Sequence, residues 1–449
     1  MSKQPIQLSD HFTYPRLLRF VLPCIGTMLF TSIYGIVDGL CVSNFVGKTA
    51  FAAVNLIMPL PMLLGTIGFM LGTGGSAIVG ITLGEGDQKK ADRYFTLFLL
   101  AALVSVSVLA VLGIVFLRPI AVLLGAKGEL LDYAVRYGRI LMVSLPTFAL
   151  QNMFQSFFVT AEKPHLGFWF TVGAGCTNMV LDVLMVGIWG WGVEGAAIAT
   201  FISQLVGGVL PVFYFIDRSN SSRLHLCKTS FYSKVLRDAC INGSSELMTN
   251  LSMSLVNILY NYQLLRLAGE NGVAAYGVIM YAAFLFVAVF VGYAVGSAPI
   301  VSFHYGARNH AEVHNLYRKS LRLIAVVAVT LTLASMFIIP CVARVFVGYD
   351  AELLALTSRA FRLYALSFLI MGFNVYASSF FTALGDGVTS ALISFLRTLV
   401  FQVIAILLLP LLLGIDGIWL AVTAAELAAL AVSAAMLLTK DKVFHYRKA

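Results

Sequence analysis

Charged residues are scarce in this chain. They make up 11% of its 449 residues, whereas hydrophobic residues make up 59%. Soluble globular domains usually carry about 25% charged residues. This composition excludes a soluble cytosolic enzyme, a disordered interaction protein and a secreted disulfide scaffold, and it indicates a membrane protein.

Motifs for common catalytic chemistry are missing from the sequence as well. The six cysteines are scattered and include no C-x-x-C pair, so no disulfide framework is indicated. Gly47-Lys48-Thr49 resembles the end of a Walker A loop, but Val42 stands where that loop needs a glycine. No nucleophile–base set and no H-E-x-x-H motif falls within an apolar run. We therefore expect a protein that is not an enzyme, hydrolyses no ATP and needs no cofactor.

The chain does contain a series of long apolar runs. Each is close to the ~20 residues that a membrane-spanning helix needs. They cover residues 17–43, 50–80, 94–117, 134–159, 166–189, 195–216, 235–263, 272–303, 321–343, 360–383, 389–413 and 417–439. The sequence predicts an all-α polytopic membrane protein with about twelve transmembrane helices.

The two halves of the sequence repeat each other at a constant offset of 222 residues. The matched pairs include Gly74 with Gly296, Gly84 with Gly306, and Gly192 with Gly414. Six spans per copy give both copies the same orientation, an arrangement typical of secondary transporters with a site between the halves. We predict a six-helix lobe at 1–216, a cytoplasmic linker at 217–234 and a second six-helix lobe at 235–449.

The cationic residues indicate the orientation of the chain. Most of the 30 Lys and Arg residues fall in the segments that share a side with the two termini. Cytoplasmic loops carry such an excess, so we expect both termini in the cytoplasm. This distribution accounts for the net charge of +9 without a nucleic acid partner. The expected surroundings are the lipid bilayer, and the expected state is a monomer.

Four acidic residues lie well within apolar runs: Asp38, Asp182, Glu246 and Glu426. A charge at the centre of a bilayer costs at least about 2.5 kcal/mol, so such residues usually face a polar cavity or mark an ion pathway. Arg397 is the one mid-span cation in the sequence, and we expect it to pair with an acid.

Asp38 and Asp182 form the stronger candidate site. Asn178 and Asp182 are four residues apart, so they share one helix face. If the two carboxylates converge, they can hold Na⁺ through hard oxygen ligands or share one proton, and both alternatives use the same atoms. Their repeat partners are Tyr260 and Ile404, so ion coupling is expected in the first half only.

Glu246 and Glu426 are candidates for binding a cationic substrate. Either could instead make a polar contact between helices. Aromatic side chains favour organic cations, and the apolar runs offer several that could line a cavity: Phe154, Phe157, Phe158, Tyr281 and Phe284. The chain has 33 Phe and 18 Tyr residues, so for any single one of them a packing or lipid-facing position is favoured over a place in the cavity wall.

At these residues the sequence resembles the multidrug and toxic compound extrusion (MATE) family, and most closely its bacterial MepA-like branch. The stretches that carry the resemblance are Ile33-Tyr-Gly-Ile-Val-Asp38, Thr177-Asn-Met-Val-Leu-Asp182, Gly192-Val-Glu-Gly-Ala-Ala-Ile-Ala-Thr200 and Pro299-Ile-Val-Ser-Phe-His-Tyr-Gly-Ala307. Their order and spacing cover almost the whole chain. The resemblance implies a V-shaped pair of six-helix lobes that exports organic cations and dyes in exchange for H⁺ or Na⁺. It also implies that the chain lies in a bacterial plasma membrane.

The resemblance also implies roles for individual residues. The ion site of the first lobe corresponds to Asp38, Asn178 and Asp182, which would be the metal ligands if the coupling ion is Na⁺, with Tyr137 and Thr200 in support. On the substrate side, the candidates are Glu246, Asn374 and Glu426. Some branches have an aspartate where this sequence has Asn374, so its contribution differs from theirs.

The function expected from the sequence is secondary active multidrug efflux by alternating access. One alternative is a flippase for a lipid-linked saccharide, a relative of related architecture. Its cavity would need several basic residues for the pyrophosphate, whereas only Arg397 lies at depth here. A less favoured alternative is an intramembrane enzyme, for which the sequence offers neither a nucleophile–base set nor a metal site.

Overall fold

The protein, seen in a computed structural model, is an all-α polytopic membrane protein. The structure describes residues 6–46, 48–348 and 350–447, with the side chains of residues 39–44, 48, 345 and 346 left out. Its helices are α1 Tyr14–Val46, α2 Lys48–Ile57, α3 Pro59–Gly84, α4 Gln88–Leu123, α5 Gly128–Thr160, α6 Pro164–Asp182, the π-helix η1 Val183–Ile188, α7 Gly192–Gly208, α8 Leu210–Ile216, α9 Ser233–Asn242, α10 Ser244–Gly306, α11 His310–Val347, α12 Ala351–Ala365, α13 Phe368–Ala383, α14 Gly387–Phe395, the π-helix η2 Leu396–Val400, α15 Phe401–Leu413, α16 Ile415–Thr439 and α17 Asp441–Phe444.

These helices account for the twelve apolar runs of the sequence. Within the described ranges, nine helices are long and apolar enough to cross a membrane, and the bent pair α12–α13 makes a tenth. Helix α10 contributes two crossings, because its 63 residues are interrupted at Gly269 (φ 61°, ψ −151°), a conformation that glycine adopts without a Cβ clash. Helix α5 has 33 residues and packs among α3, α4 and α7. It corresponds to the remaining apolar run, residues 134–159.

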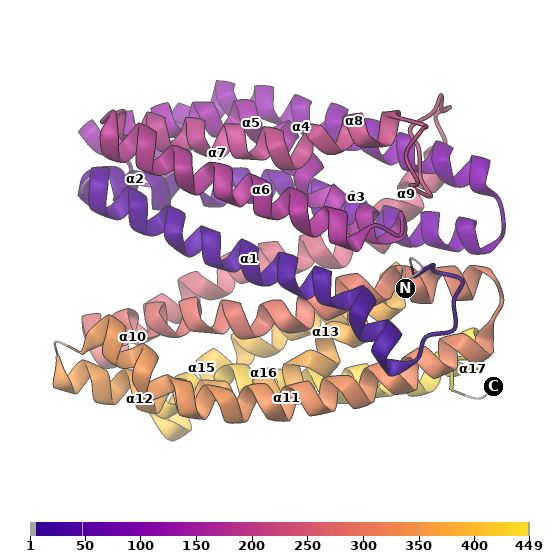
Figure 1. Cartoon of the computed structure of the whole chain (residues 1–449). Helices are drawn as coiled ribbons and strands as arrows, with labels where there is room; N and C mark the ends of the chain where they lie inside the picture. Colours follow the sequence, from indigo (N-terminus) through magenta and orange to yellow (C-terminus); the bar gives the residue numbers. More distant parts are fainter. Residues whose placement is uncertain (1–5, 47, 349, 448–449) are drawn as a thin grey trace.

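The helices form two bundles that lie side by side (Figure 1). Helices α1–α8 make the first bundle and α10–α17 the second, with residues 217–232 and helix α9 between them. Both chain ends lie at one end of the molecule, which we call the terminal end (Figure 1). The predicted lobes include residues 1–5 and 448–449, which lie outside the described residues.

Glycines hold the two bundles in close contact near the terminal end. A Cβ atom on Gly84 of α3 would lie 2.7 Å from the backbone nitrogen of Ala307 and even closer to the carbonyl oxygen of Phe303. A Cβ atom on Gly306 of α10 would likewise lie 2.7 Å from the carbonyl carbon of Ile81. Both the glycines and their partners Ile81 and Phe303 are related by the 222-residue offset. The interface is therefore pseudo-symmetric, with each copy of the repeat presenting the same surface to the other.

The segment before α1 also bridges the bundles at the terminal end. The backbone N–H of Leu8 donates to Oε1 of Glu162 in the α5–α6 loop at 2.8 Å. The backbone N–H of Phe12 donates to Oε1 of Glu312 in α11 at 2.9 Å. Leu8 and Phe12 are fully buried, so this segment is part of the packed structure that joins the bundles.

Candidate functional site

Asp38 and Asp182 come together inside the first bundle, which meets the condition that the sequence analysis set for a shared ion site. Asp38 lies on α1 and Asp182 ends α6, two helices that pack against each other. Their side chains are within hydrogen-bonding reach of one another. Two carboxyl groups can form a hydrogen bond only if one of them carries a proton, so the pair needs a proton or a metal cation between its oxygens.

The surroundings leave this acid pair without fixed donors. Asp182 is fully buried, and neither of its carboxylate oxygens has a hydrogen-bond partner among the described residues. The same holds for Oδ1 of Asp38. Buried polar atoms nearly always find a partner, and an exception calls for an explanation. The pair is therefore a candidate site for a proton or a metal cation.

Local helix geometry places Asp182 where the backbone departs from α-helical form. The π-helix η1 starts at Val183, directly after Asp182. Insertions of this kind occur frequently at functional sites, because they shift side chains out of the regular helical register. Asp182 therefore lies at the junction between α6 and η1, where the helical register changes.

The supporting ligands proposed for this pair differ in their surroundings. Tyr137 on α5 is buried and interacts electrostatically with both acids, while its hydroxyl makes a long 3.9 Å contact with Sδ of Met58. Asn178 is buried, and its Nδ2 has no partner among the described residues. Thr200 lies on α7, which packs against α5 and α6, but no hydrogen bond from its side chain to either acid occurs within the described part of the chain.

A separate cavity of about 360 Å³ lies in the second bundle. Its wall comes mainly from α10 and α12–α16, with Thr73 and Ser76 of α3 and Ser156 of α5 closing one side. Neither Asp38 nor Asp182 lines it. The structure therefore separates the two candidate sites predicted from the sequence, one in each bundle.

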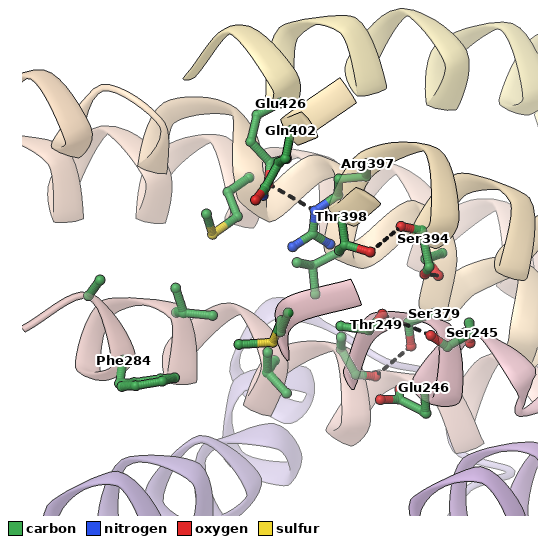
Figure 2. A pocket seen from close by; sticks show the side chains of 18 of the residues that line it. Ser245, Glu246, Thr249, Phe284, Ser379, Ser394, Arg397, Thr398, Gln402 and Glu426 are labelled. Atoms are coloured by element: carbon green, nitrogen blue, oxygen red, sulfur yellow. Dashed lines mark hydrogen bonds and ion pairs between the residues drawn. The ribbon is translucent and has the colours of Figure 1, made fainter. Parts of the chain in front are cut away.

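Aromatic rings form part of the cavity wall. Tyr260 and Tyr276 stack with their ring centroids 5.0 Å apart at an angle of 13°, and both face the cavity. The hydroxyl of Tyr276 donates to Oδ1 of Asn257 at 2.7 Å. Phe284 also lines the cavity (Figure 2). Tyr260 is the repeat partner of Asp38, so the position of an acid in one bundle holds a cavity-lining phenol in the other.

Arg397 and Glu426 form an ion pair on the cavity wall, which confirms the expectation that Arg397 pairs with an acid. Nε of Arg397 donates to Oε1 of Glu426 at 2.9 Å (Figure 2). Glu426 is fully buried, whereas the side chain of Arg397 is 13% exposed. Arg397 lies within the second π-helix, η2, so each π-helix in the described part of the chain adjoins or contains an ionisable intramembrane residue.

Asn374 lies behind this ion pair and outside the cavity lining. Its Nδ2 donates to Oε2 of Glu426 at 2.7 Å, and its Oδ1 accepts from the hydroxyl of Ser433 at 2.9 Å. The residue is fully buried and absent from the cavity wall. Its contacts fit a residue that orients Glu426.

Glu246 lies on the cavity wall without such partners (Figure 2). It belongs to the first turn of α10, and its carboxylate interacts electrostatically with the guanidinium group of Arg397. No ion pair or hydrogen bond to its carboxylate occurs among the described residues. Of the two acids on the described cavity wall, Glu426 is paired with Arg397 and Glu246 is not paired.

Of the five aromatic residues named as possible lining residues, Phe284 lines the cavity, whereas Tyr281 is not among the described lining residues. The other three pack elsewhere. Phe154, Phe157 and Phe158 pack in the buried core of the first bundle, where Phe154 stacks on Phe215 with centroids 5.5 Å apart. They do not line the cavity. Sequence reasoning also missed lining residues such as Gln402 and Asn257. Their signal was available, because both are polar residues within apolar runs.

Comparison with known proteins decides the family. A family model described as MatE matches residues 23–184 and, a second time, residues 247–408. The two matches span well over half of the chain and follow its duplication. The chain belongs to the MatE family.

Known relatives of this MatE protein match it over nearly its full length. Multidrug export protein MepA from Staphylococcus saprophyticus is 21% identical over 433 residues, which cover 95% of this chain and 94% of that protein. These findings confirm the family resemblance and its MepA-like branch.

Solved structures share the fold of this MatE protein. A crystal structure of MATE in complex with MaL6 has a TM-score of 0.92 at 22% sequence identity, covering 99% of this chain and 100% of that chain. The outward-facing conformation of a multidrug resistance MATE family transporter also gives a TM-score of 0.92 at 22% identity, covering 99% of each chain. At this identity the likeness establishes the fold and confirms the predicted fold class.

Proposed function

We propose that this MatE protein is a secondary active multidrug exporter, which exchanges organic cations for H⁺ or Na⁺ by alternating access. The MepA relatives, named multidrug export proteins, support the cargo class. The observation that carries the proposal is the acid pair Asp38–Asp182, in which Asp182 is fully buried. Both oxygens of Asp182 and Oδ1 of Asp38 lack a hydrogen-bond donor among the described residues.

The acid pair serves as the ion-coupling site of the proposed exporter. Asp38 and Asp182 bind one H⁺ or one Na⁺, with Asn178, Tyr137 and Thr200 in support. If the ion is Na⁺, the metal ligands are Asp38, Asn178 and Asp182. Occupancy of this site biases the equilibrium between the two access states, because the ion binds one state more tightly than the other. No further cofactor takes part, and the protein acts as a monomer.

The cavity of the second bundle is the proposed cargo site. Glu246 supplies an unpaired negative charge, and the stacked Tyr260 and Tyr276 supply aromatic surface for a flat cation. Glu426 contributes through its pair with Arg397, and Asn374 orients Glu426. A volume of about 360 Å³ falls within the range of small-molecule sites.

We further propose that the terminal end faces the cytoplasm, in keeping with the distribution of Lys and Arg. The functional units are then a lobe at 1–216, a linker at 217–234 and a lobe at 235–449. Because the glycine contacts join the bundles at the terminal end, access is from the outside in this state. The protein would lie in a bacterial plasma membrane.

The test is ethidium transport by the purified chain in liposomes. A Na⁺ gradient is imposed in one experiment and a pH gradient in another, with protein-free liposomes as the control. We expect one gradient to drive ethidium against its concentration gradient, which also identifies the coupling ion. Failure of both gradients to move ethidium contradicts the proposal.

A lipid-linked saccharide flippase gains no support from the cavity. A pyrophosphate needs several cationic partners, whereas Arg397 is the one Lys or Arg among the described lining residues. Its Nε is already bound to Glu426.

A further inference from the structure

Cationic residues concentrate where the start of α1 lies beside α11, at the terminal end (Figure 1). Tyr14, the first residue of α1, contacts two of them: Nη1 of Arg322 lies 3.5 Å from its hydroxyl, and Nζ of Lys319 lies 5.5 Å from its ring centroid. Helix α1 belongs to the first bundle and α11 to the second, so this cationic cluster spans both bundles. Its members are Arg16 and Arg19 of α1 and Arg318, Lys319 and Arg322 of α11.

The cationic cluster has no acid that compensates its charge within the described residues. None of its five side chains takes part in the seven ion pairs of that part of the chain. The one acid of α11 is Glu312, and it is engaged by Nδ1 of His11 at 2.6 Å and by the backbone N–H of Phe12 at 2.9 Å. The cluster is therefore available to an anion from outside the protein.

The repeat shows at which depth the cluster lies. Helices α4 and α11 are repeat partners, since their first residues differ by the 222-residue offset. Arg322 of α11 corresponds to Leu100 of α4, and one turn further on Val326 corresponds to Val104. Leu100, Val104 and Val326 are all exposed apolar side chains, as expected for contact with lipid chains. Arg322 thus lies one turn from the hydrocarbon, at the level of the lipid headgroups.

The repeat partner of Arg318 differs from it in a telling way. Arg318 is exposed, whereas its partner in α4, Thr96, is buried. The linker covers α4 at this point, because the backbone N–H of Cys227 donates to Oγ1 of Thr96 at 3.1 Å. The second bundle presents a cationic surface where the first is covered by its own chain.

Both helices place apolar surface directly beside these cations. Arg19 and Leu22 are three residues apart on α1, and Arg322 and Val326 are four apart on α11, so each pair shares one helix face. All four side chains are exposed. A ligand that matches this surface carries an anionic group next to a hydrocarbon chain, whereas a free phosphate ion would leave the apolar part unused.

We propose that α1 and α11 form a binding site for the headgroup of an anionic phospholipid in the leaflet at the terminal end. The arginine forks match phosphate oxygens, and basic pockets between transmembrane helices bind such headgroups. Tyr14 adds a hydroxyl at the interfacial level where tyrosine is enriched. The acyl chains lie along Leu22 and Val326.

The lipid also links the two bundles. Its phosphate contacts α1 of the first bundle and α11 of the second, so it binds best when these helices lie together, as they do in this structure. A ligand stabilises the state that it binds more tightly, so the lipid favours the state in which the terminal ends touch. The inference does not rest on the proposed exporter function.

The experiment measures lipid binding to the purified full chain in detergent by native mass spectrometry. Dioleoylphosphatidylglycerol is the anionic probe, and dioleoylphosphatidylcholine has the same chains without net charge. Glycerol 3-phosphate, added as a competitor, offers the anion without the chains. Each variant removes two exposed cations, and the matched control is on α4 at the same end of the molecule. The variants are Arg16→Gln/Arg19→Gln, Arg318→Gln/Arg322→Gln and the control Lys89→Gln/Arg93→Gln.

The wild-type chain is expected to bind one phosphatidylglycerol more tightly than phosphatidylcholine. The α1 variant and the α11 variant each weaken this binding at least about tenfold, as expected for two cations beside an anionic headgroup. Their affinity for phosphatidylcholine stays at the wild-type level. The α4 control keeps the wild-type affinity for both lipids, and glycerol 3-phosphate does not displace the bound phosphatidylglycerol.

Other outcomes overturn the inference. Equal affinity of the wild-type chain for the two lipids, or an equal loss in the α4 control, shows that the cluster is not a specific site. Displacement by glycerol 3-phosphate identifies a site for a free anion instead of a lipid. A loss confined to one of the two helices shows that the site does not span the bundles. If a double variant fails to fold, the single variants Arg19→Gln and Arg322→Gln should each still weaken phosphatidylglycerol binding selectively.

Discussion

Alanine at Gly84 or Gly306 should push the two bundles apart at the terminal end. The added Cβ atom would lie 2.7 Å from a backbone atom of the opposite bundle in each case, and closer still to a carbonyl oxygen. Backbone atoms cannot rotate away as a flexible side chain can, so the helices themselves must separate. Overpacking of this kind costs about 1–3 kcal/mol.

That cost falls only on the state in which these helices touch. A difference of about 1–3 kcal/mol shifts a two-state equilibrium roughly 5- to 150-fold. Both variants should therefore populate a state with the terminal ends apart. Gly277→Ala is the matched control, because this glycine is also on α10 and a Cβ atom there meets nothing within 4 Å.

The assay is a distance measurement between spin labels at the exposed positions 89 and 318, on α4 and α11, in a chain whose six native cysteines are replaced. The long-distance population should grow in Gly84→Ala and Gly306→Ala and stay at the wild-type level in Gly277→Ala. Identical distance distributions in all three variants would refute the reasoning. The two glycines are repeat partners, so each variant checks the other.

Two further predictions concern ion pairs. Arg397→Met should lower the free energy of unfolding by about 3–5 kcal/mol, because it leaves Glu426 as an unpaired buried charge. Adding Glu426→Leu to this variant should recover most of the loss. Equal thermal stability of the single and double variants in detergent would contradict this prediction. Asp386, in the loop before α14, has a lowered pKa: burial opposes its ionisation, but the ion pair with Lys440 and the hydrogen bonds from Thr389 outweigh that effect. The ionised Asp386 carboxylate adds to the free energy of unfolding at pH values above its ordinary pKa, and this stabilisation is lost as the pH falls through its lowered pKa in the folded state. The difference in the free energy of unfolding between wild type and Asp386→Asn should therefore shrink between about pH 7 and about pH 3. A difference that does not change with pH would contradict this prediction.

Hydropathy predicts the helices of this protein well because each one must match the thickness of a bilayer. The twelve apolar runs and the duplication are local patterns that need no knowledge of packing. The break in α10 at Gly269 could also be anticipated, since this residue lies between the apolar runs 235–263 and 272–303. The bend between α12 and α13, by contrast, falls inside one continuous apolar run.

Some features of the candidate sites could likewise be predicted from local sequence patterns, whereas others depend on tertiary packing. Asp38 and Asp182 are conspicuous because acids are costly in a membrane, and the spacing of Asn178 and Asp182 fixes a shared helix face. The partners of Arg397 are not visible in sequence, because Glu426 comes from another helix whose register depends on tertiary packing. For the same reason the sequence could not reveal that Asn374 lies behind Glu426, or that Tyr276 stacks on Tyr260.

Uphill ethidium export by Asp38→Asn and Asp182→Asn is the measurement that tests the coupling site most directly. Each variant is reconstituted in liposomes under the gradient that drives the wild-type chain, with Asp132→Asn, an exposed position on α5, as the matched control. The account predicts that both variants bind ethidium and fold normally but no longer accumulate it against its gradient, while the control does. Uphill export at the wild-type rate by both variants would contradict the account.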